Sequence, residues 1–397
     1  MDNFLIVLHR KIFLIFYIHK IYNIFLGERK MSQKLEVFYN RKPCYDIVIE
    51  QDFNNLTNEI SKLDCSNKKI CIITDSVVAS IYKDEVLKLL KSICKNIVFY
   101  SFSSGENQKN LSTVNNIYNF LIEHQFDRKD ILLALGGGVV GDITGFVAAT
   151  YLRGIDYIQV PTTLLSQVDS SIGGKTGVDF EQYKNMIGAF KMPKLVYINI
   201  HTLTTLDERQ YYNGFAEAMK HGLIRDSMYY EWLLSNMYEI CDREPEVLEE
   251  LVYRSCQIKK TIVEKDPLEQ GERAILNFGH TIGHAIEKYM NFSLMHGECV
   301  ALGCVAAAYI SWKKQLLSME EYYEVRDMFV PFNLPITIDD VNVDEIIKIT
   351  KSDKKMEQDI IKFILLKKIG KAVIDRTVTE EELKSGIEEI IYKDEME

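Results

Sequence analysis

The sequence predicts an α/β N-terminal domain with a parallel sheet, followed by a mostly α-helical C-terminal domain. Short apolar runs alternate with amphipathic segments through the first half of the chain, as they do around a parallel sheet. After about residue 205, helical periodicity dominates instead. The length of 397 residues allows two or three domains, at ~150 residues each.

The first half of the chain supplies the expected strands and helices in alternation. The run 70–74 is continuously apolar, as in a strand that is buried on both faces of a parallel sheet. Asp75 and Ser76 follow it directly, where the N-cap of a helix would stand. Apolar or alternating runs predict the other strands at 34–39, 45–49, 96–102, 131–135 and 157–160, and amphipathic patterns predict helices at 54–63, 77–90, 111–124 and 143–151.

The second half of the chain is expected to be helical, with a minor hairpin near 360–374. We place the domain boundary near 190–206, where the pattern changes. This gives an α/β domain over residues 31–200 and a helical domain over residues 201–397. The predicted helices are 207–225, 227–237, 245–264, 281–290, 297–315 and 319–329.

The first thirty residues fit neither domain. The apolar stretch 4–26 is interrupted by His9, Arg10, Lys11, His19 and Lys20. A membrane-spanning helix needs about 20 mostly apolar residues, so none is expected here. The stretch also lacks the small-residue cleavage site of a secretory signal. We therefore expect Met31 to be the true start and residues 1–30 to be an extraneous or disordered extension.

Charge and cysteine usage narrow the class of protein. The formal net charge of −10 argues against a general nucleic-acid binder, which carries a net basic face. The eight cysteines are spread singly without a C-x-x-C pair, so a thiolate zinc site is not expected. Isolated cysteines fit a reduced, cytoplasmic setting. We expect no nucleic-acid partner and no membrane association.

A glycine-rich loop suggests a Rossmann-like nucleotide site. Gly136, Gly138 and Gly141 match G-x-G-x-x-G between a predicted strand and a predicted helix. Glycines there let the backbone approach a pyrophosphate at the helix N-terminus. The loop comes late in the α/β run, and Asp156 precedes a strand instead of ending one, so the usual ribose-binding acid is missing. A tight turn that merely needs glycine is the alternative.

Histidines and a glutamate in the second half suggest a metal site. His280 and His284 are four residues apart and share one face of a helix. His296 follows them, and Glu217 offers a carboxylate on an earlier helical segment. A catalytic zinc needs three such ligands and one open position. A pair of core histidines satisfied by hydrogen bonds is the alternative, and spacing alone leaves both interpretations open.

The middle of the chain carries residues suited to an anionic ligand. The segment 169–177 contains hydroxyls, glycines and Lys175, which is the chemistry of a phosphate or carboxylate pocket and suggests a flexible loop. It is not a P-loop, because the required glycine position is occupied by Asp169. Arg153 and Lys184 lie nearby in the sequence. A solvated loop with scattered charge is the simpler interpretation for any one of these residues.

Taken together, the motifs are similar to those of the 3-dehydroquinate synthases, in the sugar-phosphate cyclase family. The resemblance covers roughly residues 34–380. It is carried by Ser104-Gly105-Glu106 with Lys109, and by the segments 136–142, 151–154, 160–165, 168–176, 184–185, 214–217 with Lys220, 276–280 with His284 and His296, and 353–355. So many motifs in one order make the match far more specific than any one of them.

The resemblance implies a reaction, two cofactors and a partner. The family converts 3-deoxy-D-arabino-heptulosonate 7-phosphate (DAHP) to 3-dehydroquinate and phosphate, in the shikimate pathway of aromatic amino acid biosynthesis. NAD takes a hydride from C5 of the sugar and later returns it, and a divalent metal, zinc or cobalt, acidifies the C5 hydroxyl. Phosphate elimination, ring opening and aldol closure complete the reaction. A homodimer is implied, because the arginine matched by Arg153 reaches in from the neighbouring subunit.

The resemblance also assigns roles to individual residues. Glu217, His280 and His296 would hold the metal, so His284 would instead lie beside the substrate phosphate. The NAD site would use Asp75, Glu106, Lys109, Gly137, Gly138, Val139, Asp142, Thr162, Thr163, Lys175, Lys184 and Thr205. The phosphate would be surrounded by Arg153, Lys175, Asn185, His284 and Lys355, and the hydroxyls and carboxylate would be held by Lys220, Lys259, Arg273 and Asn277.

Two acidic residues match family positions, and one position differs from the family pattern. Asp169 matches a family position that orients active-site groups. Glu269 matches a family acid, although the substrate's own phosphate can take the key proton. Pro267 stands where many members carry another residue, and it would stiffen the loop before Arg273. The sequence therefore does not determine in which direction the Glu269 side chain points.

Three alternatives remain at this point. A metal- and NAD-dependent polyol dehydrogenase shares the two-domain plan but would release NADH. A cyclase for another sugar phosphate is the second, although Arg273 and Lys259 favour an acidic substrate. A catalytically inactive metal- or nucleotide-binding protein is the third.

Overall fold

A computed structural model describes residues 33–181, 183–339, 341–352, 356–357 and 360–392. Residues Lys34–Glu397 form one compact unit. The expected extension 1–30 and the predicted site residue Lys355 lie outside the described residues. No helix among the described residues is both long and apolar enough to cross a membrane.

The described residues contain a main sheet of seven strands in the order β1-β2-β9-β6-β5-β3-β4. The pairs β2–β9, β9–β6, β6–β5, β5–β3 and β3–β4 are all parallel. This confirms the expected parallel sheet. The strands are β1 (Gln33–Tyr39), β2 (Lys42–Glu50), β3 (Lys69–Asp75), β4 (Asn96–Phe102), β5 (Ile131–Gly136), β6 (Asp156–Pro161) and β9 (Leu195–Asn199).

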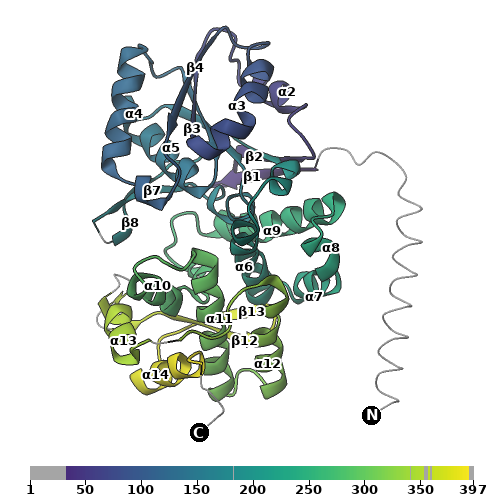
Figure 1. Ribbon diagram of the computed structural model, residues 1–397, viewed down its shortest axis with the longest axis vertical. Helices are drawn as coiled ribbons and strands as arrows, with labels where there is room; N and C mark the ends of the chain where they lie inside the picture. Colours follow the sequence, from purple (N-terminus) through teal and green to yellow (C-terminus); the bar gives the residue numbers. More distant parts are fainter. Residues whose placement is uncertain (1–32, 182, 340, 353–355, 358–359, 393–397) are drawn as a thin grey trace, which may run out of the picture. The chain divides into compact units, whose positions relative to one another are not determined.

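Helices cover the sheet on both faces, as Figure 1 shows for α3, α4 and α5. Alternate residues of β3 enter different cores, because side chains alternate across a strand. Ile70 and Ile72 pack with helices α2 and α3, whereas Cys71 and Ile73 pack with α4 and α5. The helices are α2 (Leu56–Ser61), α3 (Ser76–Leu90), α4 (Leu111–Glu123) and α5 (Gly138–Thr150).

The strand order creates a topological switch point at β3, where a nucleotide-binding crevice is expected. Strand β3 has β4 on one side and β5 on the other, so the chain changes direction across the sheet at this point. In open α/β sheets, ligands bind beyond the carboxyl ends of the strands at such a switch point. Asp75 ends β3 and Gly136 ends β5. The glycine loop therefore lies beside this switch point, although it does not follow the first strand.

Two local expectations were wrong. Helix α5 begins at Gly138, five residues before the expected start at 143, because glycines lower helix propensity and hide a helix start. The segment 169–177 was expected to be a flexible loop. Instead it spans the end of a helical turn, η3 (Ser166–Ser170), and the start of a hairpin formed by β7 (Lys175–Phe180) and β8 (Tyr183–Phe190).

The second half of the described chain is mostly helical, as expected, and Figure 1 shows α10 to α14 grouped around β12 and β13. The hairpin near 360–374 is confirmed by the antiparallel pair β12 (Phe363–Lys368) and β13 (Lys371–Asp375). The helices are α6 (Glu208–Arg225), α7 (Ser227–Ser235), α8 (Met237–Cys241), α9 (Pro245–Lys265), α10 (His280–Tyr289), α11 (His296–Lys313), α12 (Met319–Asp327), α13 (Val343–Ser352) and α14 (Glu380–Glu389).

Glycine lets helices α6, α10 and α11 approach one another at backbone distance. A methyl group on Gly303 of α11 would lie 1.8 Å from the carbonyl oxygen of Gly279, the residue before α10. A methyl group on Gly297 would lie 2.0 Å from the carbonyl oxygen of Asn213 on α6. No other residue fits at either position without displacing backbone. The three helices are thus held in one fixed arrangement.

The domain division near residues 190–206 stays a prediction.

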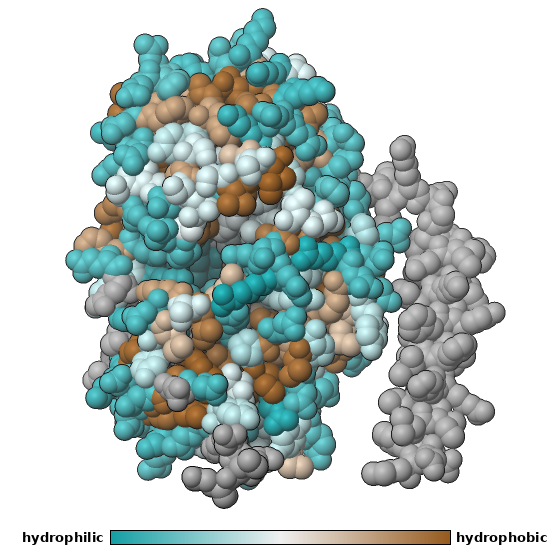
Figure 2. All heavy atoms as spheres, in the orientation of Figure 1, coloured by the Kyte–Doolittle hydropathy of each residue, from teal (hydrophilic) through white to brown (hydrophobic). Residues whose placement is uncertain are grey.

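On the face drawn in Figure 2, hydrophilic residues cover much of the described unit, and a recess with a hydrophilic rim is visible near the middle.

Candidate active site

Three helices bring Glu217, His280 and His296 together. Glu217 lies in the middle of α6, while the two histidines are the first residues of α10 and α11. The Oε1 atom of Glu217 lies 3.4 Å from Nε2 of His280 and 3.3 Å from Nε2 of His296. The sequence could not show this convergence, because it depends on the close packing of the three helices.

The environment of these groups fits a divalent cation. The side chain of Glu217 is fully buried, and neither of its oxygens accepts a well-formed hydrogen bond from the described residues. Buried carboxylates without such bonds are costly. Burial would raise the pKa of Glu217, but Lys220 and His280 outweigh it and hold that pKa well below its usual range. One carboxylate and two imidazoles are the ligand set of an open catalytic zinc.

Two further groups of possible ligands overlap with this one. His284, Glu287 and His296 form the first, and Asp169, Glu217 and His221 form the second. The carboxylates of Glu287 and Asp169 are each paired with a lysine, as Glu217 is paired with Lys220. Lys184 Nζ lies 2.7 Å from Glu287 Oε1, and Lys259 Nζ lies 2.6 Å from Asp169 Oδ1. The histidine rings of His280, His284 and His296 nevertheless form one cluster, with centroids 5.1 to 5.8 Å apart.

Buried lysines surround the carboxylates. Lys220, one turn after Glu217 on α6, makes an ion pair with it and is 1% exposed. Burial would lower the pKa of Lys220, but Glu217 and Asp169 raise it above its ordinary value. Lys259 of α9 pairs with Asp169, yet burial dominates there and lowers the pKa of Lys259. The site thus holds two cationic groups of different basicity close to its carboxylates.

Predicted nucleotide residues meet at the crevice. Lys109 lies just after η1 (Glu106–Gln108), is 6% exposed, and contacts Asp142 of α5 at 2.6 Å. Burial would lower the pKa of Lys109, but Asp142 and Glu106 raise it above its ordinary value. Lys109 also donates to the Asn185 side chain on β8 at 2.6 Å. Glu106 itself lies 3.3 Å from Lys184 of the same strand.

The other predicted nucleotide residues have local partners. Asp75 caps α3 by accepting from the backbone N–H groups of Val77 and Val78. Thr205 contacts the Tyr82 hydroxyl at 2.6 Å. Gly137, Gly138 and Val139 open α5, and a methyl group on Gly137 would meet Thr163 at 3.0 Å. Thr162 is buried directly after β6.

The loop between α9 and α10 carries three predicted substrate residues. Glu269, in a left-handed conformation with φ 58°, pairs with Lys175 and accepts from the Asn277 side chain at 2.8 Å. Arg273 is 1% exposed and donates to the carbonyl oxygens of Pro267 and Gly173, while its Nε has no partner among the described residues. The Arg273 side chain therefore ties the loop at Pro267 to the backbone of Gly173.

Arg153 takes part in none of the contacts given above for the other predicted site residues. Arg153 is exposed at the end of η2 (Tyr151–Arg153), directly after α5, and both Leu152 and Arg153 are in left-handed backbone conformations. Lys355 lies outside the described residues.

Sequence reasoning missed Glu287 and His221. Glu287 is 3% exposed and follows His284 by three residues on α10, so a charged residue on the histidine face was the available signal. His221 is fully buried, follows Lys220 directly, and lies 3.5 Å from Asp169. No spacing pattern marked it.

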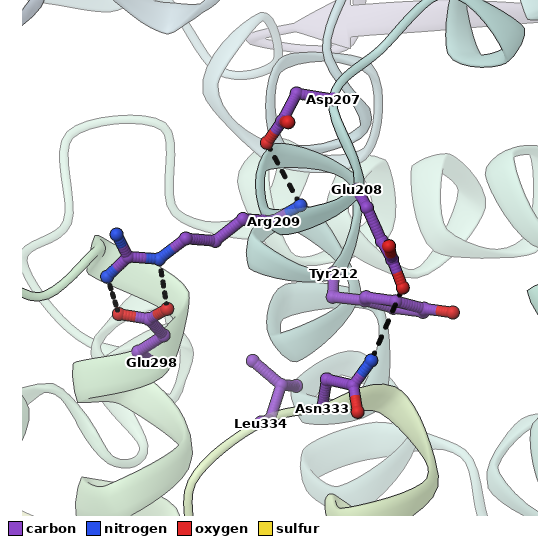
Figure 3. A pocket seen from close by; sticks show the side chains of 7 residues that line it. All are labelled: Asp207, Glu208, Arg209, Tyr212, Glu298, Asn333 and Leu334. Carbon is purple, nitrogen blue, oxygen red and sulfur yellow. Dashed lines mark hydrogen bonds and ion pairs between the residues drawn. The ribbon is translucent and has the colours of Figure 1, made fainter.

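A separate cavity of about 340 Å³ lies at the N-terminal ends of α6 and α11, shown in Figure 3. Arg209 binds Glu298 through Nε and a terminal nitrogen at 2.7 and 2.8 Å. This pair joins α6 to α11 two residues after His296, so it supports the ligand cluster from outside. The cavity is lined by Asp207, Glu208, Arg209, Tyr212, Glu298, Asn333 and Leu334, none of which was predicted as a site residue.

Comparison with known families agrees with the motifs. A model of the 3-dehydroquinate synthase N-terminal domain matches residues 99–213, and a model of the C-terminal domain of the same family matches residues 214–356. The 3-dehydroquinate synthase of Acetivibrio thermocellus is 44% identical over 339 residues, which cover 85% of this chain and 94% of that protein.

Solved structures of other enzymes share the fold. The 2-epi-5-epi-valiolone synthase ValA of Streptomyces hygroscopicus, with NAD+ and Zn2+ bound, is 26% identical with a TM-score of 0.81, covering 90% of this chain and 99% of that one. A 2-deoxy-scyllo-inosose synthase complexed with carbaglucose-6-phosphate, NAD+ and Co2+ is 25% identical with a TM-score of 0.81, covering 91% of this chain and all of that one. The family models and the 44% identity show that this chain belongs to the 3-dehydroquinate synthase family.

Proposed function

We propose that Glu217, His280 and His296 bind a divalent cation and that the surrounding side chains carry the family's reaction. Family membership assigns that reaction to the chain: it is a phosphate-eliminating cyclase that converts DAHP to 3-dehydroquinate and phosphate in the shikimate pathway. The convergence of three ligand side chains from three helices carries the proposal.

NAD and zinc, or cobalt in its place, are the proposed cofactors. ValA holds NAD+ with Zn2+, and the 2-deoxy-scyllo-inosose synthase holds NAD+ with Co2+. The cation supplies positive charge that acidifies a substrate hydroxyl. NAD supplies a hydride acceptor that returns the hydride within one turnover. The switch point beyond β3 and β5, with Lys109 and Asp142 at its edge, is the proposed nucleotide site.

The protein's own groups bind and orient the substrate in this proposal. Lys220 and Lys259 stand beside the cation site and would neutralise substrate oxygens. Glu269 is held by Asn277 and Lys175, so it is aimed in one direction and can hold a proton there. Arg273 would exchange its backbone carbonyl partners for the substrate carboxylate. The proposed phosphate ligands are Arg153, Lys175, Asn185, His284 and Lys355.

The homodimer, the cytoplasmic setting and the division into domains 31–200 and 201–397 belong to the same proposal. Arg153 is exposed and its backbone is in a left-handed conformation, which supports a role beyond its own subunit. All eight cysteines are free thiols, which supports a reducing compartment.

Phosphate release from DAHP tests the function directly. Purified protein with NAD should release phosphate, and chelation should abolish the release until Zn2+ or Co2+ is restored. The absorbance of NADH should not accumulate, because the hydride is returned. Net NADH accumulation without phosphate release would support the polyol dehydrogenase instead. A matched Glu249→Gln variant, which changes a buried carboxylate on α9, should keep full activity.

A further inference from the structure

Glu287 is a buried carboxylate without a role in the reaction described above. It lies on α10 and is 3% exposed. Its Oε1 atom lies 2.7 Å from Lys184 Nζ, and its Oε2 atom lies 3.9 Å from His296 Nδ1. A buried charge is costly unless it is paired, so a carboxylate at this position needs partners on both oxygens. One partner is a lysine, and the other is a proposed metal ligand.

The two proposed histidine ligands are oriented in the same way. Nδ1 of His280 lies 3.0 Å from the carbonyl oxygen of Phe278, and Nδ1 of His296 faces Glu287. In both rings the other nitrogen, Nε2, faces Glu217. An acceptor at Nδ1 keeps the proton there and leaves the Nε2 lone pair for a cation. The backbone carbonyl provides this acceptor for His280, and Glu287 is placed to provide it for His296.

Glu287 is not suited to bind the cation itself. Its Oε2 lies 3.9 Å from Nδ1 of His296, whereas Oε1 of Glu217 lies 3.4 Å from Nε2 of His280 and 3.3 Å from Nε2 of His296, so Glu217 is the better placed ligand. Lys184 is fixed further by Glu106 at 3.3 Å and by the Phe292 ring at 5.0 Å. Lys184 therefore holds Glu287 against α10, with Oε2 directed to His296.

We propose that Glu287 is a positioning residue that sets the tautomer and the orientation of His296 for the cation. The separation of 3.9 Å is longer than a hydrogen bond, so the proposal requires Nδ1 of His296 and Oε2 of Glu287 to approach within about 3.2 Å when the cation is bound. The proposal rests on the metal site described above. It adds one residue that never contacts the metal or the substrate but determines how tightly the metal is held.

Zinc affinity in the absence of NAD tests the proposal without any measurement of activity. Competition with a chromophoric chelator gives the dissociation constant for wild type, Glu287→Gln and Glu287→Ala. Outer-shell partners contribute about 10- to 100-fold to metal affinity. We expect about a tenfold loss for Glu287→Gln, whose amide oxygen still accepts a hydrogen bond from the Nδ1–H group, and about a 100-fold loss for Glu287→Ala. Glu249→Gln is the matched control and should bind zinc like wild type.

Two spectroscopic readouts separate a positioning role from a structural one. The Co2+ absorption spectrum should keep its band positions in Glu287→Gln, because the three ligands are unchanged. Nitrogen-15 NMR of the histidine rings should show the Nδ1–H tautomer of His296 in wild type and a mixture of tautomers in Glu287→Ala. Thermal unfolding shows whether Glu287→Ala folds. If it does not, Glu287→Gln alone decides the question.

Each outcome decides between the two proposals. If wild type binds one zinc ion and both Glu287 variants bind it equally well, the positioning role is wrong and the metal site stands. If wild type binds no zinc, both proposals fail. A loss beyond about 1,000-fold in Glu287→Ala, with a changed Co2+ spectrum, exceeds an outer-shell effect and would make Glu287 a ligand, which also overturns the inference.

Discussion

The ammonium group of Lys109 lies 2.6 Å from the carboxylate of Asp142. Their side chains are 7% and 18% exposed, and Lys109 also donates to Asn185 on β8. One lysine thus joins the loop after β4, the first turns of α5 and the β7–β8 hairpin at the edge of the proposed nucleotide crevice. The sequence contained all three residues, but nothing in it predicted that they contact one another.

Lys109→Met should strongly destabilise the protein. The substitution leaves Asp142, whose side chain is only 18% exposed, without its cation, and breaking a buried ion pair costs about 3–5 kcal/mol, which is the upper limit here. Urea unfolding, with the nucleotide absent, measures this cost. Lys351→Met is the control, because Lys351 is 44% exposed, its partner Glu380 is 61% exposed, and their pair is expected to contribute less than about 1 kcal/mol. Equal losses for both variants would contradict the prediction.

Gly303→Ala should destabilise the protein although alanine is the better helix former. The methyl group would meet the carbonyl oxygen of Gly279 at 1.8 Å, so backbone must move. We expect a loss of at least about 2 kcal/mol, which exceeds the gain of about 1 kcal/mol from helix propensity. Chemical unfolding measures the balance. Gly386→Ala is the control, because its methyl group meets the end of the Ile310 side chain at 2.7 Å and the nearest backbone atom, the carbonyl oxygen of Ala306, only at 3.2 Å. It should change stability far less.

Zinc should raise the unfolding temperature of wild type but not of Glu217→Ala. A ligand that binds only the folded state stabilises it by about 2.7 kcal/mol at 100 times its dissociation constant. Glu217 contributes one of three ligands, so its removal should abolish the shift. Calorimetry with and without chelator measures both proteins. A full zinc-dependent shift in Glu217→Ala would place the cation elsewhere.

Mixing two inactive variants should restore activity if Arg153 completes the site of a neighbouring subunit. Arg153→Ala lacks the arginine and Glu217→Ala lacks a metal ligand, so each homodimer is inactive. Random exchange of equal amounts makes about half of the dimers heterodimers, and each heterodimer has one intact site of two. The mixture should therefore regain about a quarter of wild-type activity. Phosphate release from DAHP after subunit exchange measures this. No recovery, with exchange confirmed by mass spectrometry, would place Arg153 in the site of its own subunit.

Asp266→Asn should destabilise the protein at neutral pH but not in acid. The Asp266 carboxylate accepts from the backbone N–H groups of Gln270, Gly271 and Arg273. Burial opposes these bonds, but together they lower the pKa of Asp266. The stabilisation is therefore present above the unfolded pKa of about 3.9 and is lost as the pH falls through the folded value. Urea unfolding at several pH values should show the gap between variant and wild type narrowing below about pH 4.

Asp84→Asn is the control for the acid experiment. Asp84 is exposed on α3, so its variant should follow wild type at every pH. A gap for Asp266→Asn that stays constant between neutral and acid pH would show that the carboxylate charge is not what holds the loop.

The fold was largely predictable because local patterns determined it. The run 70–74 is buried on both faces of the sheet, and its continuous apolar sequence predicted this. The β7–β8 hairpin was missed because the residues of β8 alternate between partial and full exposure, without the buried positions that mark a strand, and β7 includes several polar side chains. Its pairing across residues 175–190 depends on contact with α5, which no local pattern encodes.

The sequence predicted which residues make up the candidate site but not which of them contact one another. Helical spacing alone paired His280 with His284, whereas the structure brings His280 and His296 equally close to Glu217. That geometry follows from glycine contacts between helices far apart in the sequence. Glu287 was missed for the same reason, since its significance comes from Lys184, 103 residues away.

Lys184 makes ion pairs with Glu106 on one side and Glu287 on the other. Occupancy of the nucleotide crevice would compete for Glu106 and alter how Lys184 restrains the neighbour of a metal ligand. By thermodynamic linkage, any factor by which NAD tightens zinc must equal the factor by which zinc tightens NAD. A single lysine would then couple the two cofactor sites, so that the affinity of each site depends on whether the other is occupied.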